Sequence, residues 1–77
     1  MAWYLRAVDG GTDAVEFETL DQALMQVKTL INMQRARGYQ VVKDTVKGGG
    51  RVSFFDGYQL IDTVWVEDED GLMVPIP

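Results

Sequence analysis

The sequence predicts a small α+β domain: a two-layer sandwich in which one helix packs on an antiparallel sheet of about four to five strands, in the order β(β)αβββ. One segment has helical periodicity, and the segments on both sides of it are rich in β-branched and aromatic residues. Glycine-containing turn sequences separate the β-type segments at short intervals. A chain of 77 residues has room for one core, so we expect a single domain over residues 1–77.

The N-terminal part predicts one strand and a short return strand. Residues 3–8 have the composition of a strand and run into Asp9-Gly10-Gly11, which is typical of a turn. Residues 14–17 have the composition of a second, shorter strand. The pair therefore predicts a β-hairpin ahead of the helix.

The clearest element is a helix over residues 20–37. Thr19 and Gln22 have the spacing of a capping box, in which the threonine hydroxyl accepts from the backbone amide three residues on. Gly38 stands where a helix C-terminus favours a left-handed residue. The apolar residues recur at helical spacing and predict one buried stripe: Leu20, Ala23, Leu24, Val27, Leu30 and Ile31.

The rest of the chain predicts an antiparallel meander. The expected strands cover residues 39–46, 51–55 and 58–66, with a last short strand at 72–74. Residues 47–50 form the first turn, and Asp56-Gly57 is the pair favoured in two-residue hairpin loops. An acidic turn follows at residues 67–71, and Pro75 limits further pairing.

Both faces of this predicted sheet carry large apolar side chains, although one helix can cover only one face. Strict alternation places Leu60 and Val64 on one face of the long strand, and Ile61 and Trp65 on the other. The uncovered face therefore predicts a contact with another protein or with a second copy. A bulge near Gly57, or a tail that folds back over the sheet, explains the same pattern without a partner. The interface residues predicted from this pattern and from the acidic turn are Tyr4, Phe55, Tyr58, Leu60, Trp65, Asp68, Glu69 and Asp70.

Charge is distributed unevenly along the chain. The formal net charge is −5, but residues 28–51 carry six basic residues and one acidic residue. Part of this distribution matches the helix dipole, with acids at the start of the helix and arginines at its end. Lys43, Lys47 and Arg51 lie close together in sequence near two phenylalanines, which predicts, as an alternative, a small nucleic-acid-binding surface.

Catalytic chemistry has few candidate residues here. The chain contains no histidine and no cysteine, which removes the commonest general base, the thiolate nucleophile and the usual zinc ligands. The acidic run at residues 67–71 lacks the order of a calcium-binding loop, and the glycine run at 48–50 lacks the spacing of a phosphate-binding loop. We therefore expect no enzyme, no cofactor and no bound metal.

These observations predict a protein-binding module. Its size and acidity suggest a small inhibitor or accessory protein of the phage or mobile-element kind, such as anti-CRISPR or anti-restriction proteins, that occupies a partner surface. A nucleic-acid-binding module and a homodimeric structural domain are the two alternatives. Because the sequence contains neither a membrane-length apolar run nor a leader-like N-terminus, we expect a cytoplasmic protein with no membrane partner.

Overall fold

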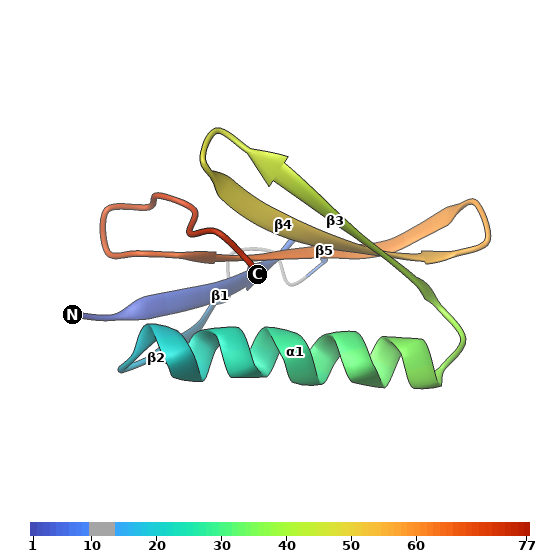
Figure 1. Cartoon of the computed structure of the whole chain (residues 1–77), viewed down its shortest axis with the longest axis horizontal. Coiled ribbons are helices and arrows are strands. Elements are labelled where there is room, and N and C mark those ends of the chain that lie inside the picture. Colours follow the sequence, from blue (N-terminus) through green and yellow to red (C-terminus); the bar gives the residue numbers. More distant parts are fainter. Residues whose placement is uncertain (10–13) are drawn as a thin grey trace.

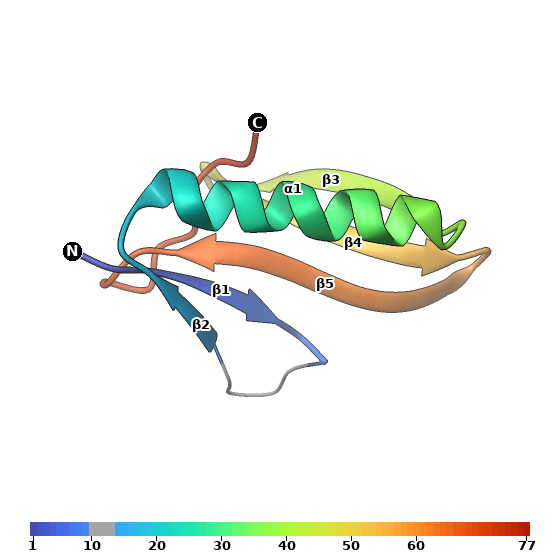
Figure 2. The same ribbon diagram turned by 90° about the horizontal axis from the view of Figure 1, so that it is seen from below.

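The computed structural model describes residues 1–9 and 14–77 and confirms the predicted α+β sandwich. Five strands form one antiparallel sheet in the order β2-β1-β5-β4-β3, and the helix α1 lies across one face of it (Figures 1 and 2). The predicted turn at residues 9–11 lies mostly outside the described residues. The elements are β1 (Trp3–Ala7), β2 (Ala14–Phe17), α1 (Leu20–Ala36), β3 (Gln40–Val46), β4 (Gly49–Asp56) and β5 (Gln59–Glu67).

Both ends of α1 are closed by the residues that the sequence predicts. The Thr19 hydroxyl accepts a hydrogen bond from the Gln22 backbone amide at 3.2 Å. Gly38 has a φ of 86°, so the chain reverses in a left-handed conformation that glycine adopts without strain. The Gly38 amide donates to the Arg35 carbonyl and the Tyr39 amide to the Gln34 carbonyl, the two bonds of a Schellman motif. These caps orient α1 before it packs on the sheet.

The core lies between α1 and the face of the sheet that α1 covers. Ala23, Val27 and Ile31 of the predicted stripe are buried against this face. Strand register brings the facing side chains together, because cross-strand partners share a face. The sheet contributes Leu5, Val52, Phe54, Val64 and Val66 to this core.

A β-bulge between β4 and β5 changes which residues of β5 share a face, compared with the strict alternation expected from the sequence. Phe55 pairs with Leu60, whereas Phe54 pairs with Asp62, so Ile61 is the extra residue. Ile61 packs against the core together with Val64, instead of sharing a face with Trp65. The bulge therefore exchanges two apolar residues between the faces. Ile61 joins the core and Leu60 joins Trp65 on the uncovered face, so large apolar side chains remain there.

Both hairpin turns of the meander differ from the predicted ones. The loop between β4 and β5 is Gly57-Tyr58, one residue later than predicted, because Asp56 pairs with Gln59. The loop between β3 and β4 is only residues 47–48, both with positive φ, as in a type I′ turn. Gly49 and Gly50, predicted as part of that turn, are buried residues of β4.

The C-terminal segment explains why β4 begins with two glycines. The Val74 amide donates to the Val66 carbonyl of β5 at 2.9 Å, and the Gly50 amide of β4 donates to the Val74 carbonyl at 3.1 Å. Val74 thus lies between β4 and β5 where the two strands separate, and Figure 1 shows this segment running between them. The predicted strand at 72–74 is reduced to a single bridge between Glu67 and Met73.

The segment also crosses from one side of the sheet to the other. A Cβ atom on Gly49 would meet Met73, and a Cβ atom on Gly50 would meet Ile76. Successive residues of a strand face opposite sides, so Met73 lies on the side away from α1 and Ile76 lies on the core side. Ile76 and Val74 pack against the core.

Candidate functional site

The face of the sheet opposite α1, called the open face below, carries four of the predicted interface residues. Tyr4, Phe55, Leu60 and Trp65 alternate with core residues and are brought to this one face by the register. Leu60 is 51% exposed, whereas the other three are half-buried by their neighbours. Tyr58 lies in the hairpin turn and is fully exposed, so it is not part of the face.

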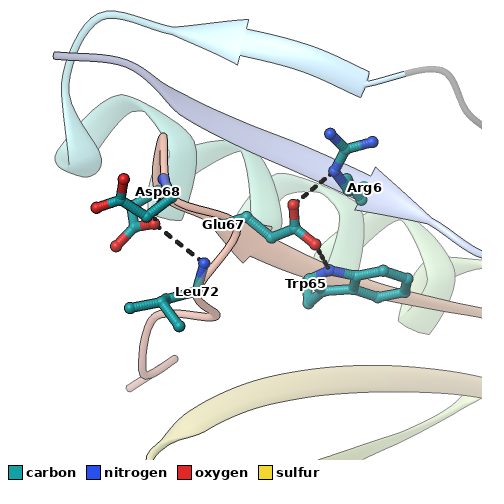
Figure 3. Close-up of polar contacts among 6 residues, drawn as sticks. Arg6, Trp65, Glu67, Asp68 and Leu72 are labelled. Carbon is teal, nitrogen blue, oxygen red and sulfur yellow. Dashed lines mark hydrogen bonds and ion pairs between the residues drawn. The ribbon is translucent and has the colours of Figure 1, made fainter.

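The polar side chains at the centre of the open face bind one another. The Arg6 Nε donates to Glu67 Oε2 at 2.7 Å, and the Trp65 indole Nε1 donates to Glu67 Oε1 at 2.9 Å. Figure 3 shows the Glu67 carboxylate lying between the guanidinium and the indole. The side chain of Glu67 is 18% exposed, so this partly buried carboxylate has a partner on each oxygen.

Side chains also form ion pairs and hydrogen bonds with one another toward the edges of the open face. Arg51 donates to the Asp44 carboxylate from both Nε and Nη2, at 3.2 and 2.9 Å. The Tyr4 hydroxyl donates to Glu16, whose negative charge is the main reason that the pKa of Tyr4 is raised above 10.0. The charged groups of this face are therefore largely matched within the chain.

Acidic side chains of the turn after β5 also accept hydrogen bonds from within the chain. Asp68 Oδ1 accepts from the backbone amides of Asp70 and Leu72, at 2.9 and 3.0 Å, and so closes the turn (Figure 3). Glu69 accepts from the Ala2 amide and forms an ion pair with the N-terminal ammonium group. Of the predicted acidic interface residues, Asp70 is the one whose carboxylate has no such contact among residues 1–9 and 14–77. In the same part of the chain, no group of three or more acidic side chains is placed to hold a metal ion.

The three basic residues predicted to bind nucleic acid do not share a surface. Lys43 pairs with Val52 and so faces the α1 side, whereas Arg51 pairs with Asp44 on the open face. Lys47 lies in the turn between their strands. A phosphate backbone that follows one side of this hairpin meets at most two of the three.

Lys43 belongs instead to a groove between α1 and β3, called the α1–β3 groove below. The groove has a volume of about 590 Å³, within the range of known ligand sites. Its apolar floor includes Leu24, Ile31 and Ile76. Figure 2 shows α1 running alongside β3 and β4 with the C-terminal segment beside them. The groove is therefore bordered by the helix flank, the edge strand and the tail that crosses the sheet.

Three cations line the α1–β3 groove: Lys28 and Arg35 from the helix and Lys43 from β3. None of them forms a salt bridge with any described residue, in contrast to Arg6 and Arg51 on the open face. Lys43 Nζ donates at 3.1 Å to the main-chain oxygen of Pro77, the last residue of the sequence, so its ammonium group already has one acceptor. Among the described residues of the lining, Asp21 has the one acidic side chain. In a chain of net charge −5, the groove is locally positive.

The sequence indicated this site only in part. Lys28 and Arg35 are seven residues apart, or about two helical turns, which places them on the same side of α1. Lys43 joins them only through the pairing of β3 with β4. No protein-family model, curated protein or solved structure matches this chain. Within the described residues, no helix has both the length and the apolar character needed to cross a membrane.

Proposed function

We propose that this protein is a non-enzymatic protein-binding module that holds an acidic segment of its partner in the α1–β3 groove. The observation that supports this most directly is the pair of helix cations without salt-bridge partners, Lys28 and Arg35, above an apolar floor, with Lys43 bonded only to the main-chain oxygen of Pro77. An anionic, partly apolar segment satisfies both features, because it pairs the cations and covers the floor. Inhibition of the partner, expected from the size and acidity of the chain, is the consequence if that segment is functional in the partner.

The open face supports this proposal less directly. Its aromatic side chains are suited to a protein contact, but Arg6 and Arg51 are already paired with Glu67 and Asp44. Among the described residues, the cations of the open face are therefore not available to select an acidic partner. The groove provides that selectivity, so we assign the partner segment to it.

A binding measurement with the full chain tests the proposal. The probe is a fluorescein-labelled peptide of alternating Glu and Val, and its counterpart carries Lys in place of Glu. We expect fluorescence anisotropy to show binding of the Glu peptide only, weakened by added salt because exposed charge pairs are screened. Backbone amide shifts in an NMR titration should change along α1 and β3.

A matched pair of variants locates the site. Lys28→Glu with Arg35→Glu reverses two groove cations, whereas Arg37→Glu with Lys47→Glu makes the same charge change outside the groove. We expect the first pair to weaken binding about tenfold or more and the second about twofold or less. Equal effects, tighter binding of an oligothymidine probe, or NMR shifts confined to the open face would each overturn the assignment.

A further inference from the structure

The outer edge of β3 borders the α1–β3 groove and has no strand beside it. Within the described residues β3 pairs only with β4, and it stands last in the sheet order. Its seven residues therefore present a row of backbone amides and carbonyls along that edge. The other edge strand, β2, has four residues and lies far from the groove in the sheet order.

The groove and this edge are arranged so that a single ligand can use both. Strand β3 places Lys43 on the groove side and Val42, which is 47% exposed, on the open-face side. A strand added beside β3 continues the same alternation, so every second side chain of the ligand faces the groove and its cations. The remaining side chains lie next to Val42.

The dimensions agree with this arrangement. The helix residues that line the groove extend from Asp21 to Arg35, an axial distance of about 21 Å. Six residues of an extended strand span about 20 Å. Lys28 and Arg35 are about 10 Å apart along the helix, a separation that acidic side chains two to four strand residues apart can match.

We propose that the partner segment binds as a sixth strand, paired with β3 through its backbone, with acidic side chains at alternate positions facing Lys28, Arg35 and Lys43. This inference rests on the proposed function and specifies its binding mode. Main-chain hydrogen bonds to β3 give affinity, and the cations select acidic residues at every second position. The ligand class is an extended segment of another protein whose acidic residues alternate with β-branched or other apolar residues.

Two comparisons with the full chain test the strand mode. The alternating Glu and Val peptide is compared with an isomer that contains the same residues in two blocks, which cannot place all its acids on one face of a strand. The alternating peptide is also N-methylated at single positions, which removes one backbone donor at a time. We expect the block isomer to bind at least about tenfold more weakly. N-methylation should weaken binding about tenfold at alternate positions and about twofold or less at the positions between them.

The outcomes separate the two proposals. If the alternating and block peptides bind equally and N-methylation has no alternating effect, the strand mode is wrong while acidic-segment binding stands. If no acidic peptide binds, both are wrong. Sedimentation should show a monomeric free protein, and a dimer whose β3 amides are already protected from hydrogen exchange would overturn the strand mode in favour of pairing between two copies.

Discussion

Substitution of Gly49 by Ala tests whether the C-terminal segment is part of the folded core. An added Cβ at this position would lie 2.4 Å from the Met73 Cβ and 2.9 Å from its carbonyl oxygen. Because a contact this close forces one partner to move, and the nearest atoms belong to the tail, we expect residues 73–76 to be displaced. The φ of Gly49 is not positive, so backbone strain does not contribute.

The size of the effect follows from what the displaced tail loses. Two backbone hydrogen bonds involve Val74, each contributing about 1 kcal/mol. Val74 and Ile76 are partly buried against the core, which adds roughly 2 kcal/mol together. The released residues regain conformational freedom that offsets roughly half of this. The net loss in the free energy of unfolding is about 2 kcal/mol.

Urea unfolding followed by tryptophan fluorescence measures this loss. With a slope of about 1 kcal/mol per M, the midpoint should fall by about 2 M. In a Met73→Gly background the 2.4 Å contact is absent while the 2.9 Å contact with the main-chain oxygen remains, so Gly49→Ala should cost less than in the original chain. An ordinary strand glycine gives the opposite result, since alanine there is favoured by about 0.5–1 kcal/mol. An unchanged or raised midpoint would therefore refute the displacement of the tail.

Three further predictions concern local interactions. Thr19→Ala removes the N-cap and should lower stability by about 1 kcal/mol in urea unfolding, with Thr19→Asp as the variant that keeps it. Glu67→Ala leaves the Trp65 indole donor without its partner, so we expect a loss of about 1–2 kcal/mol and a changed fluorescence spectrum; an unaltered spectrum would contradict the contact. Glu16→Gln should lower the pKa of Tyr4 in an NMR titration of its ring, because the carboxylate that disfavours the phenolate is gone. The raised pKa of Tyr4 also means that its contribution to stability decreases as pH rises above 10.0, and this dependence should be weaker in the variant.

The helix and most strands were predictable because their determinants are local. Thr19, the apolar stripe and Gly38 lie within or next to α1. The structure confirms both caps and five residues of the stripe, whereas Leu24 lines the α1–β3 groove. The two-layer architecture is confirmed as well, and the five strands of the sheet lie within the predicted range of about four to five, without the extra short strand expected at 72–74. The rule that successive strand residues face opposite sides of the sheet gave a wrong face at the bulge, because the pairing of β4 with β5 decides which side Ile61 faces.

The tail and the groove depend on contacts between distant parts of the chain. Gly49 and Gly50 have the composition of a flexible turn, and only the passage of residues 73–76 beside them shows why a side chain is excluded. The groove likewise combines α1, β3 and Ile76, which no local pattern connects. Most of the predicted open-face residues do gather on one face, but the two arginines beside them are already paired with Glu67 and Asp44.

The passage of the C-terminal segment between β4 and β5 constrains the order in which the molecule assembles. The β3–β4–β5 meander pairs residues near one another in sequence and can form early. The pairing of β4 with β5 ends at Arg51 and Trp65. Beyond that pair, Val74 of the C-terminal segment fills the space between the two strands, so this segment needs both strands in place before it can bind. The Val74 and Gly50 amides should therefore open together, as a unit that exchanges with solvent faster than the central pairs of the sheet. We therefore expect the tail, which packs against the core and borders the α1–β3 groove, to become ordered only after β4 and β5 have paired.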